Sequence, residues 1–190
     1  GKGKLSKRDG DKLGFPVFPL NWEDPATGSL SKGYKESGYF SEAVVNFLAF
    51  LGWNPGTEQE LFDLSELVEA FDLKNIHKAG ARFLKDKTKW FNHQYMQKAS
   101  TETLTKTFAN STPELKTIDP AYIELVVNLI RERATFPSEF WGLSHYFFKA
   151  PESFAEAALK KAWKEPSKDL MTQLIKQLEA ADDSSVGALQ

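Results

Sequence analysis

Apolar residues recur at intervals of three and four along most of this chain, and this spacing constrains its fold more than any other feature. It is the spacing of one helix face, so it predicts a series of amphipathic α-helices. The first predicted helix has Ser41 as its N-cap, ends near Gly52 and presents Phe40, Val44, Phe47, Leu48 and Leu51 on one face. Further helices are predicted over residues 63–72, 86–99, 101–109, 120–133, 139–148, 153–163 and 167–181.

Two predicted helices also carry a start signal. Asp63 is followed three residues later by Glu66, and Ser153 is followed by Glu156, so each pair predicts a capping box. Residues 1–35 are instead rich in Gly and Pro, which indicates loops with a minor β contribution. We therefore expect a mainly α fold.

The composition excludes several classes of function. The net charge of the 190 residues is −2, so attraction to nucleic acid or anionic lipid requires a local patch. Cysteine is absent, which excludes disulfides and Cys-ligated zinc and suits a reducing cytoplasm. The three histidines are far apart, so we expect no metal site. The longest apolar run, residues 43–53, is too short to span a membrane.

No sequence motif identifies an active site. The chain lacks the G-x-x-x-x-G-K-[ST] phosphate loop, G-x-G-x-x-G, H-E-x-x-H and G-x-S-x-G. Carboxylates are numerous but dispersed, so no pair is indicated for acid and base catalysis. A stand-alone enzyme is therefore disfavoured. Two alternatives remain: part of a larger enzyme, or a complete, non-catalytic helical module that binds RNA or a protein partner.

Three segments favour the first alternative. Lys4–Arg8 reads KLSKR and resembles the KMSKS loop of class I aminoacyl-tRNA synthetases, in the spelling of the glutamyl-tRNA synthetases. Gly38–Trp53 resembles that family's G-Y-x-P-E-A-L-x-N-x-L-x-x-L-G-W segment, with Ser41 in place of Pro. Lys78–Met96 resembles the family stretch that ends in W-x-N-x-x-Y. Because all three occur in the family's order, the chain is similar to bacterial glutamyl-tRNA synthetases.

The resemblance implies a C-terminal portion of a ligase that activates glutamate with ATP and Mg²⁺ and transfers it to tRNA(Glu). The implied layout is a KMSKS-type loop with an irregular connection (1–35), a tRNA stem-contact helical subdomain (36–99), the first helical anticodon-binding subdomain (100–181) and a flexible tail (182–190). Because the nucleotide-binding catalytic domain is missing, we expect these residues alone to be inactive and to hold no cofactor. We expect a monomeric cytoplasmic protein without membrane contact.

The resemblance also assigns the KLSKR loop to ATP. Lys4 and Lys7 are expected to stabilise the charge that develops on the phosphates in the transition state. Ser6, Lys7 and Arg8 are expected to bind ATP.

A basic stretch follows in residues 74–89, which contain a single acid, Asp86. We expect its cationic side chains to contact tRNA phosphates: Lys74, Lys78, Arg82, Lys85, Lys87 and Lys89. The alternative is an ordinary solvated surface. Most aromatic residues at helical spacing are expected in the core rather than stacked on bases: Trp90, Phe91, Tyr95, Trp141, Tyr146, Phe147 and Phe148.

Overall fold

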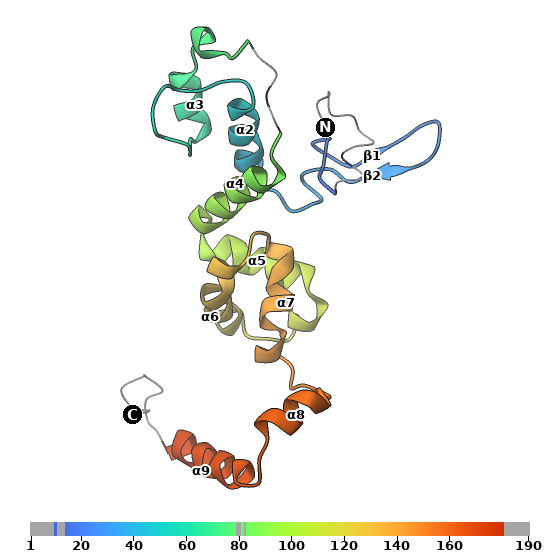
Figure 1. Cartoon of the computed structure of the whole chain (residues 1–190), viewed down its shortest axis with the longest axis vertical. Helices are drawn as coiled ribbons and strands as arrows, with labels where there is room; N and C mark the ends of the chain where they lie inside the picture. The colour runs from blue at the N-terminus through green and yellow to red at the C-terminus, as the bar shows by residue number, and fades with distance from the viewer. Residues whose placement is uncertain (1–9, 11–13, 79–80, 82, 181–190) are drawn as a thin grey trace. The chain divides into compact units, whose positions relative to one another are not determined.

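The computed structural model describes residues 10, 14–78, 81 and 83–180 (Figure 1). The chain forms two compact units, Gly1–Phe148 and Lys149–Gln190. Helices dominate both units, which confirms the predicted mainly α fold. The elements are β1 (Trp22–Glu23), β2 (Leu30–Ser31), α2 (Ser41–Phe50), α3 (Leu64–Ala70), η1 (Leu73–Asn75), α4 (Lys85–Lys98), α5 (Thr101–Ser111), η2 (Pro113–Leu115), α6 (Pro120–Ile130), η3 (Arg131–Arg133), η4 (Pro137–Glu139), α7 (Phe140–Ser144), η5 (His145–Phe147), α8 (Glu156–Ala162) and α9 (Ser167–Ala180).

The minor β contribution is a short hairpin near the N-terminus. Strands β1 and β2 pair antiparallel, with Trp22 opposite Ser31. In the connecting turn the Gly28 N–H donates to the Asp24 carbonyl at 2.7 Å, and the Ala26 N–H donates to the Asp24 carboxylate at 2.9 Å. Gly28 has φ +65°, a left-handed conformation that glycine adopts without strain.

Helices α2 and α4 pack against each other around one hydrophobic cluster, whose buried members are Tyr34, Ala43, Phe47, Phe91 and Tyr95. Asn46 is fully buried beside this cluster. Its Oδ1 accepts from the Phe62 N–H at 2.9 Å and from the Tyr95 hydroxyl at 2.6 Å. A buried polar oxygen needs such donors, so Asn46 holds the loop before α3 against both helices.

The start of α2 differs from the prediction. Ser41 is the first helical residue, and the N-cap is Phe40, which offers no capping side chain. The Ser41 hydroxyl donates instead to the Glu42 carboxylate at 2.8 Å. The predicted apolar face is also partly wrong, because Leu48 is 50% exposed while the polar Asn46 is buried. The buried residues of α2 are Ala43, Asn46 and Phe47, so the face that meets the core differs from the predicted one.

The capping box predicted at Asp63 is confirmed. The Asp63 carboxylate accepts from the Glu66 N–H at 2.8 Å, and the Glu66 carboxylate accepts from the Asp63 N–H at 2.7 Å. The hydrogen bond from the Glu66 N–H lowers the pKa of Asp63. The box predicted at Ser153 is wrong, because α8 begins at Glu156 and its N-cap is Ala155 without a side-chain bond.

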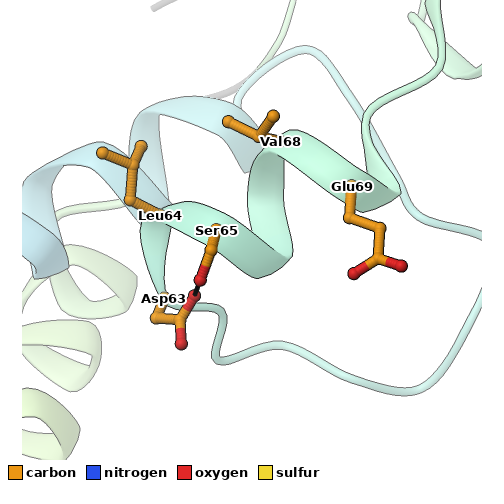
Figure 2. Close-up of a pocket in the computed structure, with 5 residues that line it drawn as sticks. All are labelled: Asp63, Leu64, Ser65, Val68 and Glu69. Carbon is orange, nitrogen blue, oxygen red and sulfur yellow. Dashed lines mark hydrogen bonds between the residues drawn. The ribbon is translucent and has the colours of Figure 1, made fainter.

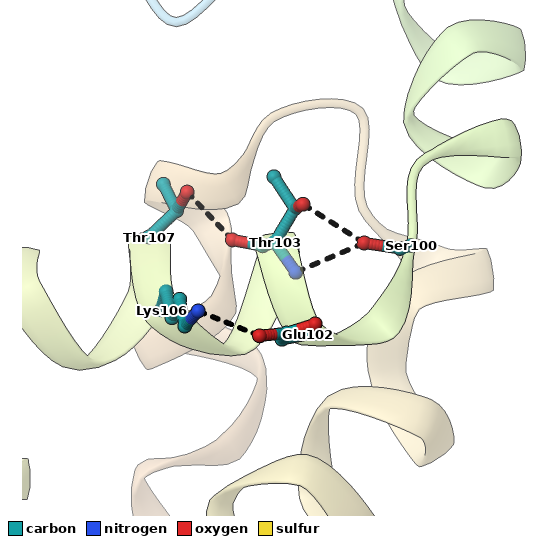
Figure 3. A network of polar contacts seen from close by, with 5 residues as sticks. All are labelled: Ser100, Glu102, Thr103, Lys106 and Thr107. Atoms are coloured by element: carbon teal, nitrogen blue, oxygen red, sulfur yellow. Dashed lines mark hydrogen bonds and ion pairs between the residues drawn. The ribbon is translucent and has the colours of Figure 1, made fainter.

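A second hydrophobic cluster is formed by α5, α6 and α7, with Met96 of α4. Its buried members are Met96, Leu104, Phe108, Leu115, Ile123, Val127, Ile130, Ala134 and Phe140. Figure 3 shows the exposed start of α5, where the Ser100 hydroxyl accepts from the Thr103 N–H at 3.2 Å. Glu102 and Lys106 form an ion pair one turn apart on the same helix.

The second unit contains α8 and α9, and neither helix contains a buried residue. Leu170, Leu174 and Leu178 follow one another at intervals of four on α9, and each is at least 42% exposed. Neither these helices nor any other in the described part of the chain is long and apolar enough to cross a membrane.

Replacing Tyr95 tests the buried network around Asn46. The hydroxyl lies within hydrogen-bond distance of both the Asn46 Oδ1 and the Phe62 carbonyl, and its one proton is shared between these two acceptors. Tyr95→Phe removes that donor from the buried site. We expect it to lower the free energy of unfolding by about 1–2 kcal/mol at pH 7, measured by urea denaturation. Tyr122→Phe is the control, because the Tyr122 hydroxyl donates to the Phe147 carbonyl at an exposed site. An equal loss in both variants would contradict the structural role of the network.

The same network predicts a pH dependence. Burial raises the pKa of Tyr95 to about 12, whereas an unfolded tyrosine ionises near about 10. The unfolded state therefore loses its proton first, and stability declines as the pH rises from about 10 to about 12. Tyr34, whose pKa burial also raises to about 12, contributes in the same range. We expect Tyr95→Phe to reduce this alkaline decline without removing it.

Candidate nucleic-acid interface

The predicted site residues fall into two groups. Lys4, Ser6, Lys7, Arg8 and Arg82 lie outside the residues that the structure describes. The other predicted tRNA contacts lie between η1 and the second turn of α4: Lys74, Lys78, Lys85, Lys87 and Lys89.

Lys74 and Lys78 lie at the surface on the segment that leads to α4. Asp72 caps η1, because its carboxylate accepts from the Lys74 N–H at 2.9 Å. This contact uses the backbone of Lys74 and leaves the side chain exposed. Lys78 follows η1 and is also exposed. Both ammonium groups are therefore accessible to an anion.

The three lysines at the start of α4, Lys85, Lys87 and Lys89, point in different directions from the helix. Lys85 and Lys89 are four residues apart and so share a helix face. Lys89 is exposed, and within the described residues no acid pairs with it. Lys87 lies between them in sequence and on the other side of the helix. The lysines of this turn are therefore not equivalent.

The Lys87 side chain already has partners within the protein. Its ammonium forms an ion pair with Glu60 and lies 4.3 Å from the centroid of the Trp90 ring and 5.3 Å from that of Phe91. Its side chain is 41% exposed. The sequence did not indicate this role, because Glu60 lies 27 residues away in an irregular loop with no local pattern linking the two. In the sequence, nothing distinguishes the alternating lysines of residues 85–89; the helix places Lys87 on a different face from Lys85 and Lys89.

Two pockets lie near this region, and neither is cationic enough to bind phosphate by itself. Figure 2 shows the first, on α3, lined by Asp63, Leu64, Ser65, Val68 and Glu69. The second, of about 350 Å³, has Lys87 as its single charged member and is otherwise lined by Phe47, Phe50, Leu51, Phe83, Leu84, Thr88 and Phe91. The exposed lysines are thus better candidates for an anion contact than either pocket.

The aromatic and histidine residues have mainly structural positions. Phe91 and Tyr95 are buried as predicted, but Tyr146 and Phe147 are 54% and 37% exposed, so the core assignment is wrong for those two. The His93 ring nitrogen Nδ1 lies 2.8 Å from the Ala134 carbonyl. Among the described residues, no group of three or more His, Asp or Glu side chains is arranged to hold a metal ion.

Comparison with known families divides the chain at α4. A model described as the catalytic domain of class I tRNA synthetases (E and Q) matches residues 2–90. A model described as an anticodon binding domain matches residues 93–190, more than half of the chain. Together the two models match nearly all 190 residues.

Similar proteins are glutamate–tRNA ligases. That of Christiangramia forsetii is 54% identical over an alignment of 192 positions, which covers 100% of this chain and 38% of the relative. That of Flavobacterium johnsoniae is 55% identical over 184 residues, 96% of this chain and 36% of the relative. The chain therefore spans little more than a third of the length of these relatives.

Two solved structures that are similar to this chain are also glutamate–tRNA ligases. The glutamate tRNA ligase from Elizabethkingia meningosepticum, in complex with its amino acid, has a TM-score of 0.90 and 46% identity over 96% of this chain and 36% of that chain. The glutamate-tRNA synthetase from Elizabethkingia anophelis has a TM-score of 0.84 and 43% identity over 100% of this chain and 37% of that chain. The alternative of an unrelated helical module finds no support in these matches. The chain therefore belongs to the glutamate–tRNA ligase family of class I tRNA synthetases, and its residues 93–190 form the match to the anticodon binding domain.

Proposed function

We propose that this chain is the tRNA-binding portion of a ligase that activates L-glutamate with ATP and transfers it to tRNA(Glu). The observation that carries the proposal is the 54% identity to a glutamate–tRNA ligase along the whole chain. The exposed side chains of Lys74, Lys78 and Lys89 support it, because cationic groups on a surface neutralise RNA phosphates.

The proposed division of labour follows the order of the sequence. We assign residues 1–35 to the KMSKS-type loop and its connection, residues 36–99 to contacts with the tRNA stem, and residues 100–181 to the first helical anticodon-binding subdomain. The tail expected over residues 182–190 lies outside the residues that the structure describes. The start of the anticodon-domain match at residue 93, inside α4, supports a division near the end of this helix.

Backbone phosphates of tRNA are the proposed ligands of Lys74, Lys78, Arg82, Lys85 and Lys89. Such contacts position an RNA without reading its sequence. Lys87 belongs to the same basic stretch, but we propose a smaller contribution for it. Its ammonium already has a carboxylate and two aromatic rings as partners, and a phosphate would have to compete with them.

ATP is proposed as a substrate of the whole ligase, accompanied by Mg²⁺, with Lys4, Ser6, Lys7 and Arg8 contacting its phosphates. The support is the KLSKR motif together with the catalytic-domain match that includes it. Charge builds up on the phosphates as the adenylate forms, and a cationic loop stabilises that charge. We further propose a monomeric enzyme of the cytoplasm, where a chain without cysteine is compatible with a reducing environment.

The 190-residue chain alone is expected to catalyse no glutamate-dependent exchange of pyrophosphate into ATP. We propose that the nucleotide pocket of the enzyme lies in the part of the relatives that this chain does not span. Radiolabelled pyrophosphate exchange checks this, with a full-length glutamate–tRNA ligase as the positive control. Exchange above background by the isolated chain would contradict the proposed division.

A pair of variants on α4 tests the phosphate contacts. We expect Lys89→Gln to weaken tRNA(Glu) binding and to reduce the slope of log affinity against log salt by about 1, because one phosphate contact is lost. Lys87→Gln is the matched control, since it removes the same charge two residues away on the opposite face. It should leave the slope nearly unchanged and change the stability by less than about 1 kcal/mol.

Fluorescence anisotropy of labelled tRNA(Glu) over a range of salt concentrations measures both slopes. Equal slopes of log affinity against log salt for Lys89→Gln and the unaltered chain would mean that Lys89 does not contact a tRNA phosphate. A larger change for Lys87→Gln than for Lys89→Gln would mean that the opposite face of α4 meets the RNA.

A further inference from the structure

The C-terminal half of α4 carries polar side chains that bind the backbone of residues 131–135, which follow α6. Three of these side chains contact backbone carbonyls of that segment, each from a residue more than 30 positions away in the sequence. The contacts are Asn92 Nδ2 to the Thr135 carbonyl at 2.7 Å, His93 Nδ1 to the Ala134 carbonyl at 2.8 Å and Gln97 Nε2 to the Arg131 carbonyl at 2.8 Å.

Arg131 binds in the opposite direction, from η3 to the end of α4. Its Nη2 donates to the carbonyls of Met96, Gln97 and Ala99 at 3.2, 2.6 and 3.0 Å, and its Nη1 donates to the Thr101 hydroxyl at 3.3 Å. The last carbonyls of a helix lack partners within the helix and carry partial negative charge. One guanidinium therefore satisfies the end of α4 and also holds the start of α5.

The apolar side chains of α4 are divided between two hydrophobic clusters. Phe91 and Tyr95 of α4 pack in the cluster with α2, whereas Met96 packs in the bundle cluster. Hydrophobic contacts are non-directional, while a planar guanidinium with several fixed donors is directional. We propose that Arg131 is a positioning residue that fixes the orientation of α4 and its lysines relative to the helical bundle.

This inference rests on the proposed function in one respect. A structured tRNA that touches the lysines of α4 and the anticodon binding domain together requires both surfaces at a set separation. If the orientation of α4 relative to the bundle varies, only a fraction of the molecules can bind both parts of the tRNA at once. The apparent dissociation constant then rises by the inverse of that fraction. Arg131 then affects tRNA affinity without touching tRNA.

Spin labels measure directly how α4 is oriented relative to the bundle of α5, α6 and α7. The chain has no cysteine, so Val45→Cys on α2 and Leu125→Cys on α6 introduce two unique label sites at exposed positions. Helix α2 packs on α4 and α6 belongs to the bundle, so the label distance reports their relative orientation. We expect Arg131→Ala to broaden the distance distribution, measured by pulsed electron resonance, while helicity by circular dichroism is retained.

Arg133→Ala is the matched control. Arg133 belongs to the same short helix η3 and is exposed, and within the described residues its side chain forms no hydrogen bond or ion pair. Its replacement should leave the distribution unchanged. Gln97→Met is a second, milder variant that loses the hydrogen bond to the Arg131 carbonyl and should broaden the distribution less than Arg131→Ala. Distributions of equal width in all variants would overturn the proposal.

Binding of tRNA(Glu) over a range of salt concentrations supplies the second readout. Arg131→Ala should raise the dissociation constant on the order of tenfold, corresponding to a competent fraction of roughly one tenth, with an unchanged salt slope. A slope reduced by about 1 with an unbroadened distribution would identify Arg131 as a phosphate contact and overturn its positioning role. If the unaltered chain binds no tRNA, the proposed function fails, while the spin-label comparison still decides the role of Arg131.

Discussion

The side-chain amide of Asn92 joins three segments of the first unit, and the arrangement around α4 depends on it. Its Oδ1 accepts from the Phe40 N–H at 2.9 Å, at the start of α2, and its Nδ2 donates to the Thr135 carbonyl at 2.7 Å, beyond η3. The residue is fully buried. If its amide were removed, the Phe40 N–H and the Thr135 carbonyl would each lose a hydrogen-bond partner that water could not replace. An amide is suited to this position because it offers a donor and an acceptor on one rigid group.

Helix α4 serves two requirements on different faces. Phe91 and Tyr95 pack against α2, and Asn92 and Gln97 hold the backbone of residues 131–135. Lys89 remains exposed. The helix therefore presents charge from an element that is held on several sides, and this rigidity is useful for a proposed contact with a structured RNA. Lys87, which pairs with Glu60 and lies near the rings of Trp90 and Phe91, is on a different face of α4 from Lys89.

Local sequence predicted helices better than their faces. The capping box at Asp63 was predictable because both of its bonds form within four residues. Ser41 and Ser153 have equally favourable side chains but do not cap, because the chain enters α2 and α8 at other positions. The exposure of Leu48 and the burial of Asn46 were not predictable, since the partners of Asn46 come from residues 16 and 49 positions away.

The sequence by itself determined the mainly α fold, the family and the basic character of residues 74–89, because helical periodicity and short motifs are local properties. Only the tertiary structure decided that Lys87 is paired, since the fold brings Glu60 to its ammonium group. It also decided that Arg131 binds the end of α4. Both outcomes depend on groups about 30 positions apart, and no local pattern encodes the distance between such groups.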